Sequence, residues 1–259
     1  MTSLLTTLQQ LLLFSATVLV TGCVAWRLVV APAAAADVGG DGSGAVRAAE
    51  DRVGTVALLA AIVVVLGWLM RGGVQLMAFR DPFVPIQEDI DLLLFQTFWG
   101  TVWMAQGAVV ILLALAIAAA GSFAAAWKAS ALLVLALTAT LTASGHAMGV
   151  DSGRAVALAA DGLHVLTAGT WLGTLAVVLF AGRPTESGPA FFAAQLRRFS
   201  PLALVSGTTL VAMGVLLSWT HLTAISDLWA TGYGRTLTAK AGLAFVVLGL
   251  GALNWQRGL

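Results

Sequence analysis

The sequence predicts an all-α fold, a polytopic bundle of about seven transmembrane helices. Hydrophobic residues make up 59% of the chain and charged residues 10%, whereas a soluble domain carries about a quarter charged residues. The mean hydropathy is +0.95. Because lipid offers no hydrogen bonds to the backbone, only helices and closed barrels cross a membrane. The apolar runs are too long and too uniformly apolar for barrel strands, so we expect helices.

Seven runs approach the length of about 20 apolar residues that a helix needs to cross the hydrocarbon core. We predict spans at residues 4–30, 53–69 (extending to about 78), 92–120, 124–144, 156–181, 201–219 and 237–254. We expect them to form a single transmembrane domain over residues 1–259, embedded in the lipid bilayer.

Polar segments separate these runs. Residues 37–45 (DVGGDGSGA) are typical of a flexible linker, residues 80–91 of an acidic loop with two prolines, and residues 183–188 of a turn. Residues 191–199 then place Arg197 and Arg198 beside apolar residues. This pattern favours a helix lying along the membrane interface.

Basic residues predict the orientation. With the N-terminus outside, most of them fall on the cytoplasmic side, as the positive-inside rule requires. The inner set is Arg27, Arg47, Arg52, Lys128, Arg183, Arg197, Arg198 and Arg257, and the outer set is Arg80, Arg154 and Arg235, with Arg71 and Lys240 near its edge. We therefore predict an outside N-terminus and a cytoplasmic C-terminus. The net charge of +1 gives no indication of a nucleic-acid partner.

Cys23 is the single cysteine, which rules out an internal disulfide, a thiolate cluster and a CxxCH haem attachment site. It ends the stretch Val20-Thr21-Gly22-Cys23, which resembles a lipoprotein cleavage box. The basic segment that precedes such a box is missing and further spans follow. We therefore interpret Cys23 as an ordinary cysteine of a membrane helix.

The three histidines fall on the same predicted side of the membrane. His146 ends the fourth span, His164 lies about two turns into the fifth, and His221 ends the sixth. At a rise of 1.5 Å per residue all three come within about 12 Å of the outer surface. This placement predicts a shared site near that surface.

Carboxylate and thioether groups accompany the histidines. Asp161 precedes His164 by three residues, so both point to one side of a helix, and a carboxylate at that depth needs a partner. A carboxylate often orients a metal-bound imidazole. Met148 follows His146 by two residues, and Met213 lies two turns deeper than His221. Imidazole and thioether ligands suit copper.

These residues therefore form a candidate metal site, with His146 and His164 as primary ligands. Its members are His146, His164, His221, Met148, Met213 and Asp161. The alternative for the histidines at helix ends is a solvated or capping role, and the alternative for the methionines is packing. His164, beside Asp161, is the hardest to explain structurally.

A short internal similarity opens the third and seventh spans. Thr97-Phe98-Trp99-Gly100 and Thr231-Gly232-Tyr233-Gly234 share the pattern T-x-(W/Y)-G, followed six residues later by Gln106 and Lys240 respectively. It suggests half-repeats at about 1–144 and 156–259, since parallel repeats are one way to build transporters. A chance similarity of helix starts is the alternative, and for Lys240 the alternative is snorkelling to the headgroups.

Several motifs taken together resemble the copper resistance protein D (CopD) family. They are Ser144-Gly145-His146-Ala147, Leu163-His164, Trp171-Leu172-Gly173, Arg198-Phe199-Ser200 with Leu202-Ala203-Leu204, Tyr233-Gly234-Arg235, Lys240 and Asn254. The resemblance covers about residues 95–254. It implies a bacterial inner-membrane protein that moves copper inward from the periplasm, beside a periplasmic copper-binding partner of the CopC type. Family members commonly have a further C-terminal span, and the family does not require His221.

Three functions are consistent with these observations. The first is a copper permease, in which Met104 and Met213 pass on an ion captured by the outer histidines; the sequence leaves the oxidation state of the copper open. The second is a b-type haem oxidoreductase with axial histidines, which a Soret band would reveal. The third is an assembly or scaffold protein. We expect no enzyme, because the chain lacks a hydrolase constellation and a phosphate-binding loop.

Overall fold

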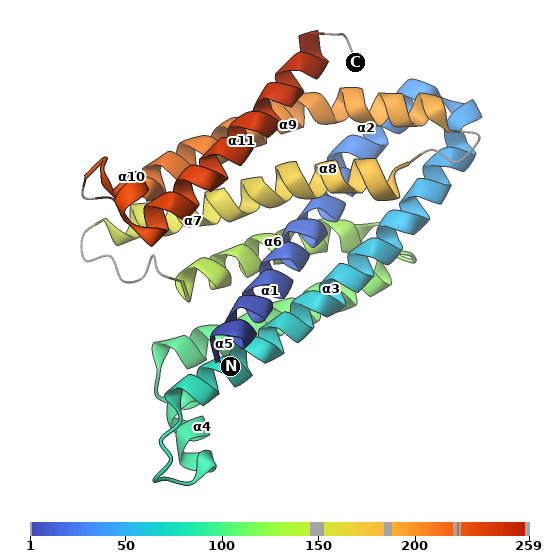
Figure 1. Ribbon diagram of the computed structural model, residues 1–259. Coiled ribbons are helices and arrows are strands. Elements are labelled where there is room, and N and C mark those ends of the chain that lie inside the picture. The colour runs from blue at the N-terminus through green and yellow to red at the C-terminus, as the bar shows by residue number, and fades with distance from the viewer. Residues whose placement is uncertain (1, 146–152, 184–187, 220–221, 223, 257–259) are drawn as a thin grey trace.

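The computed structural model describes residues 2–145, 153–183, 188–219, 222 and 224–256. This part of the chain is almost wholly helical and contains no strand. Its elements are α1 (Thr2–Ala25), η1 (Trp26–Val30), α2 (Ala31–Val38), η2 (Gly40–Gly42), α3 (Ser43–Phe79), α4 (Ile86–Phe95), α5 (Phe98–Ala119), α6 (Ala125–Ala143), α7 (Arg154–Ala168), η4 (Gly169–Gly173), α8 (Thr174–Ala176), η5 (Val177–Ala181), α9 (Pro189–Trp219), α10 (Asp227–Ala230) and α11 (Gly232–Gln256) (Figure 1).

Six helical stretches of the described chain are long and apolar enough to cross a membrane. They are Leu4–Val38, Ser43–Phe79, Phe98–Ala119, Ala125–Ala143, Arg154–Ala181 and Pro189–Ser218. They correspond to the first six predicted spans and confirm the all-α membrane fold. The seventh, residues 237–254, lies within the 25-residue helix α11, and its crossing of the membrane stays a prediction.

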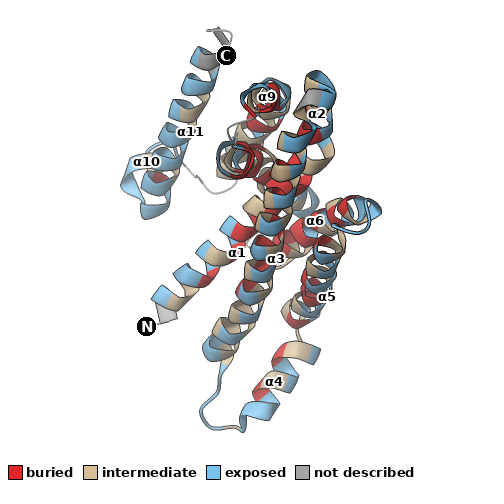
Figure 2. Ribbon diagram, turned by 90° about the vertical axis from the view of Figure 1, so that its right-hand side faces the viewer, coloured by how far each residue is buried: buried red, intermediate tan, exposed pale blue. Residues whose placement is uncertain are grey.

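α1 lies in the middle of the bundle, between α3 and the π-helical segment η4 (Figures 1 and 2). Its inner residues Val20 and Cys23, and Trp26 just beyond them, are fully buried. Cys23 thus belongs to the hydrophobic core, as expected of a structural cysteine. By contrast, α10 and α11 stand at the edge of the bundle and are largely exposed (Figure 2).

Glycines allow α1 and η4 to cross at backbone contact. A Cβ atom built on Gly173 would lie 2.1 Å from the Val18 carbonyl oxygen, and one on Gly22 would lie 2.0 Å from the Gly173 carbonyl carbon. The Thr174 hydroxyl also donates to the Gly22 carbonyl at 3.4 Å. Small residues at such spacing are how membrane helices approach closely without a hydrophobic driving force.

α3 and α5 are joined by a reciprocal pair of tryptophans. The Trp68 indole N–H donates to the Trp103 carbonyl at 2.9 Å, and the Trp103 indole N–H donates to the Trp68 carbonyl at 3.1 Å. The rings stack with centroids 4.5 Å apart. Each ring occupies the space over a glycine of the other helix, Trp103 over Gly72 and Trp68 over Gly107. We call this pair the tryptophan clasp.

The two T-x-(W/Y)-G stretches form the same local structure. In each, a threonine hydroxyl donates to the carbonyl four residues earlier and accepts the N–H of the glycine three residues later: Thr97 with Leu93 and Gly100, Thr231 with Asp227 and Gly234. Each glycine also packs on the carbonyl seven residues before it. In the first stretch, this threonine-glycine corner lies between α4 and α5 and so interrupts the predicted span 92–120. The half-repeats themselves stay a prediction.

Two segments differ from expectation. Residues 191–199 are not a separate interfacial helix but the start of α9, because Phe191, Ala194 and Gln195 are buried against the bundle. The Gln195 amide accepts the Trp26 indole N–H at 2.8 Å and donates to the Gly182 carbonyl at 3.0 Å. In place of a flexible linker at 37–45, a turn at Gly39 (φ 62°) and η2 connect α2 directly to α3.

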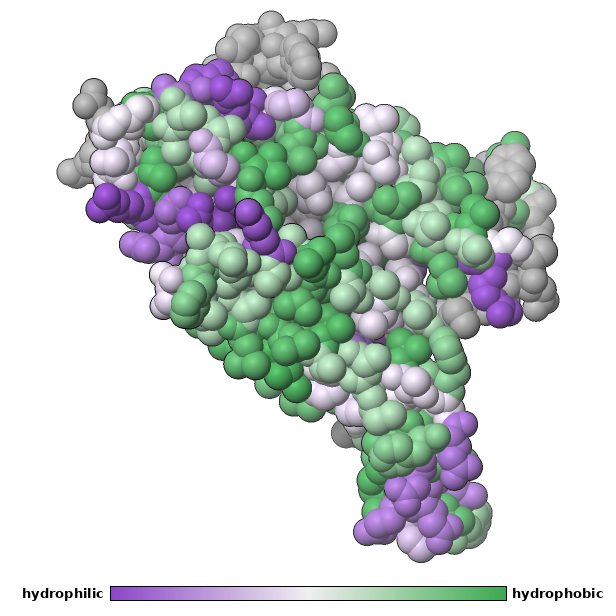
Figure 3. Space-filling view, turned by 180° about the vertical axis from the view of Figure 1, so that it is seen from behind, coloured by the Kyte–Doolittle hydropathy of each residue, from purple (hydrophilic) through white to green (hydrophobic). Residues whose placement is uncertain are grey.

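The surface matches a membrane-embedded bundle. The face in Figure 3 is largely hydrophobic, and hydrophilic residues gather at the tip formed by α4 and at the opposite end of the molecule. At the α4 tip, Arg80 and Asp89 form an ion pair at 2.6 Å. At the other end, Arg198 binds Asp37 through its Nε atom at 2.9 Å, which links α9 to α2. Exposed apolar side chains between these ends face lipid.

The close crossing of α1 and η4 gives the first prediction. Gly173→Ala should lower the free energy of unfolding by about 1–3 kcal/mol, since a side chain there overpacks a backbone contact. Thermal unfolding of the purified protein in detergent measures this. Gly54→Ala is the matched control, because a Cβ at Gly54 meets no atom within 4 Å. Equal melting temperatures for the two variants would contradict the prediction.

Candidate functional site

His164 lies on α7 and turns its ring toward α9. The Nδ1 atom is 3.2 Å from the backbone carbonyl oxygen of Leu210. A carbonyl oxygen only accepts hydrogen bonds, so Nδ1 carries the hydrogen and donates it. The other ring nitrogen, Nε2, then holds the lone pair that a metal ion binds. A backbone carbonyl of the neighbouring helix thus fixes both the tautomer and the orientation of the imidazole.

A glycine makes room for this ring. A Cβ atom at Gly214 would lie 3.3 Å from Cε1 and 3.6 Å from Nδ1 of His164. Gly214 follows Leu210 by four residues, so in a helix its missing side chain exposes the Leu210 carbonyl. Met213, the neighbour of Gly214, is half-buried in α9. Within about one turn, α9 therefore contains the Leu210 carbonyl, the thioether of Met213 and the space left by Gly214.

The charged groups within electrostatic reach of the imidazole are Asp161 and Lys240. Asp161 lies one turn earlier on α7 and points toward the end of α6, where its Oδ2 atom is 3.9 Å from the position of a Cβ on Gly145. Lys240, on α11, is exposed. The described hydrogen bond of the His164 ring goes to Leu210, so a role for Asp161 in orienting that ring stays a prediction.

The segment that leads to His146 is held from two sides. The Arg71 Nη2 atom of α3 donates to the Ser144 carbonyl at 2.9 Å, and Asp161 of α7 approaches the next residue, Gly145. The Ser144-Gly145 unit therefore sits between a guanidinium and a carboxylate. His146, Met148 and His221 lie outside the described residues. Within the described part, no three His, Cys, Asp or Glu side chains are close enough to hold a metal ion.

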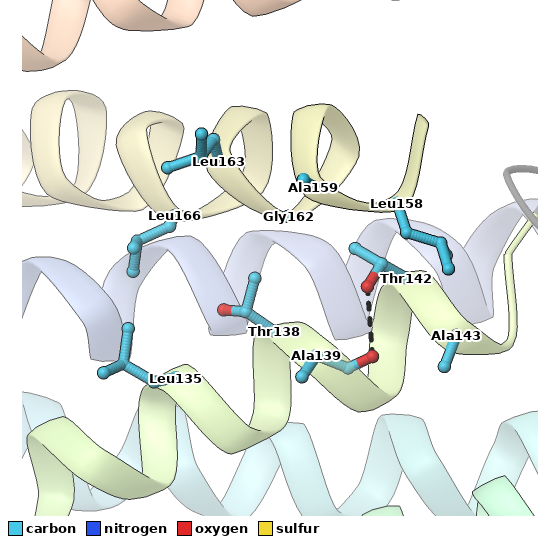
Figure 4. Close-up of a pocket in the computed structure, with 10 residues that line it drawn as sticks. All are labelled: Leu135, Thr138, Ala139, Thr142, Ala143, Leu158, Ala159, Gly162, Leu163 and Leu166. Atoms are coloured by element: carbon cyan, nitrogen blue, oxygen red, sulfur yellow. Dashed lines mark hydrogen bonds between the residues drawn. The ribbon is translucent and has the colours of Figure 1, made fainter. Parts of the chain in front are cut away.

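A groove of about 400 Å³ lies between α6 and α7 (Figure 4). Leu163, the residue before His164, is part of its lining. It is lined by Leu135, Thr138, Ala139, Thr142, Ala143, Leu158, Ala159, Gly162, Leu163 and Leu166. The two threonine hydroxyls donate to carbonyls of their own helix, Val134 and Ala139. The lining of the groove is therefore apolar and supplies no metal ligand. The contact between α7 and α9 remains the candidate site.

Two family matches cover most of this sequence. Residues 1–155 match the family described as copper resistance protein D-like, N-terminal domain, and residues 193–259 match copper resistance protein D. The chain belongs to the copper resistance protein D family. The predicted resemblance is thus confirmed, and the protein is a copper-handling membrane protein. The match at 1–155 also extends the similarity to the N-terminal helices, beyond the motifs from which it was predicted.

A relative agrees with this assignment. The copper transport protein CutJ of Bacillus subtilis (strain 168) is 31% identical over 170 residues, which are 62% of this chain and 31% of CutJ. The chain thus spans about a third of the length of that relative. No solved structure matches the chain at a significant level.

Family motifs fall at the helix contacts just described. His164 faces α9, and Trp171 stacks over Gly207 of α9 with 3.5 Å between the ring and the position of a Cβ. The sequence does not predict the contact with the Leu210 carbonyl, because every residue has a backbone carbonyl and no residue type marks this one. The one available signal is Gly214, placed four residues later.

The geometry predicts the tautomer of His164. In protein labelled with ¹⁵N-histidine, the His164 signal should show a protonated Nδ1 and an unprotonated Nε2, because Nδ1 donates to Leu210. The variant His164→Gln assigns the signal by its disappearance. A spectrum with the proton on Nε2 would show that the hydrogen bond to Leu210 is absent.

Proposed function

We propose that this protein transports copper across the bacterial inner membrane, from the periplasm inward. Two observations support this: membership of the copper resistance protein D family and the half-buried His164 ring, which is held through Nδ1 at the contact of α7 with α9. The second carries the proposal, because a membrane-embedded imidazole held by its Nδ1 atom is prepared to ligate through Nε2. The protein acts as a transporter and not as an enzyme.

In this proposal the ligands come from α7, from α9 and from the segments that follow α6 and α9. His164 of α7 and Met213 of α9 contribute an imidazole and a thioether, and His146, Met148 and His221 complete the set from the segments that follow α6 and α9. Asp161 lies between Gly145 and His164, where a carboxylate would lower the cost of bringing a cation out of water. Nitrogen and thioether donors favour Cu(I) over harder cations.

The inward direction is the one that the family resemblance implies, and the proposed orientation agrees with it. With the N-terminus in the periplasm, α6 ends and α7 begins on the periplasmic side, so copper reaches His164 from there. The acidic residues Asp81, Glu88 and Asp91 lie on the same side and attract cations. A periplasmic copper-binding protein of the CopC type is the expected donor. An ion gradient, the membrane potential or a downstream sink would supply the energy.

Removal of the central ligand tests the proposal. His164→Ala should weaken copper affinity by more than the 10–100-fold that loss of a ligand's hydrogen-bond partner costs. Competition with a chromophoric Cu(I) chelator in detergent measures affinity, and copper uptake into proteoliposomes measures transport. Met213→Leu should weaken binding less, and Met77→Leu is its matched control, because Met77 is an exposed methionine near the end of α3. Unchanged affinity and uptake in His164→Ala would refute the proposal.

A second variant removes no ligand at all. Gly214→Val should push the His164 ring off the Leu210 carbonyl and lower copper affinity about tenfold. Gly54→Val, in open space on α3, should leave the affinity unchanged. The melting temperature of each variant separates a displaced ring from a lost fold. Normal affinity in folded Gly214→Val would mean that the orientation of His164 does not matter for copper.

A further inference from the structure

A half-buried guanidinium lies beside the end of α6, next to the segment that leads to His146. Arg71 is about two turns before the end of α3, which puts it about 12 Å inside that helix end. A charge within a membrane helix is costly and usually marks a functional position. The Nη2 atom donates to the Ser144 carbonyl at 2.9 Å, and the Nη1 atom lies 3.5 Å from Oε1 of Gln106.

No carboxylate balances this charge within the described residues. The ion pairs there join Arg27 to Glu50, Arg80 to Asp89, and Arg197 and Arg198 to Asp37. Arg71 belongs to none of them. Its hydrogen bonds go to a backbone carbonyl and an amide oxygen, and the Asp161 carboxylate lies across the Ser144-Gly145 unit from it.

Gln106 of α5 adds a second anomaly. Its side chain is fully buried, with 0% exposed. The Oε1 atom faces Arg71, and the Nε2 atom has no hydrogen-bond partner among the residues that the structure describes. A buried donor that stays unpaired costs about 1–3 kcal/mol. A glutamine in this apolar helix therefore points to a ligand for its amide N–H groups.

The chemistry of the pair selects that ligand. Arginine offers five N–H donors and no acceptor, and the glutamine oxygen already faces Arg71, so only the amide N–H groups remain. The pair therefore combines a positive charge with surplus donors. A metal cation is repelled by this arrangement. An anion, which only accepts hydrogen bonds, complements it.

The tryptophan clasp limits the size of that anion. α3 and α5 carry the same pattern, Trp68-Leu69-Met70-Arg71-Gly72 and Trp103-Met104-Ala105-Gln106-Gly107. The clasp therefore brings the third residue after each tryptophan, Arg71 and Gln106, to one place. Stacked rings at 4.5 Å and indole bonds in both directions hold the two helices close together. This close packing favours a small ion over a bulky phosphate ester.

We propose that Arg71 and Gln106 form a binding site for a small monovalent anion of the chloride type, within the bundle and beside the Ser144-Gly145 unit. The anion neutralises the guanidinium and accepts the Gln106 amide N–H. Because a bound anion stabilises the folded state by mass action, stability of the protein should depend on chloride. The proposal does not depend on copper transport.

The test uses the full chain in detergent, without copper. Equilibrium dialysis against ³⁶Cl⁻ measures binding, and melting temperatures in sodium chloride and sodium gluconate of equal ionic strength measure the linked stability. The wild type should bind ³⁶Cl⁻ saturably and melt at a higher temperature in chloride. In Gln106→Glu, a carboxylate of the same shape pairs with Arg71 and replaces the anion. This variant should lose binding and melt at one temperature in both salts, at least as high as the wild type in gluconate.

Arg154→Gln, at an exposed arginine at the start of α7, is the control and should keep chloride binding. Arg71→Lys keeps the charge but loses the planar donor fork, so it should bind chloride about tenfold more weakly. Absence of saturable ³⁶Cl⁻ binding in the wild type overturns the proposal. Retained binding in Gln106→Glu, or a melting temperature below that of the wild type in gluconate, overturns it as well.

Discussion

Several helices of this bundle are joined at backbone carbonyl oxygens, each left open to a neighbouring helix by a glycine four residues later. In an α-helix the side chain of residue i+4 lies over the carbonyl of residue i, so a glycine at i+4 leaves that oxygen open to another helix. Four contacts use this arrangement: Val18 with Gly22, Trp68 with Gly72, Trp103 with Gly107, and Leu210 with Gly214. Their partners are the backbone of Gly173, two indole N–H groups and an imidazole. Because hydrocarbon satisfies no polar group, these oxygens are the partners of the Trp68, Trp103 and His164 rings.

The same constraint links the fold to the chemistry of the site. An imidazole in lipid needs a partner for its N–H, and the partner here is a backbone atom that no titration or substitution of a side chain removes. The Leu210 contact therefore orients the ring through the packing of α7 against α9. Arg71 and Gln106 show the opposite case, in which two polar side chains have fewer partners within the described chain than they have donors.

Much of the fold follows from the sequence, because lipid imposes long apolar segments that are visible in composition alone. The predicted spans and the copper family rest on such local signals, whereas the break between α4 and α5 within the predicted span 92–120 was not predicted. The prediction separates residues 191–199 from the sixth span, whereas they begin α9. Phe191 and Gln195 are buried against the other helices, and in sequence this pattern resembles that of a helix lying on the membrane surface. Contacts between helices escaped prediction: Gly214 signals an open carbonyl, but nothing local says that His164 faces it. Of the predicted ligands, His146, Met148 and His221 lie outside the described residues.

The tryptophan clasp also bears on movement. Sliding α3 along α5 by one turn would break both indole bonds together and drive each ring out of its glycine notch and against a neighbouring side chain. The tryptophan clasp therefore fixes the register of α3 against α5. A rearrangement of the bundle would therefore take place at other helix contacts and leave the register of α3 on α5 unchanged.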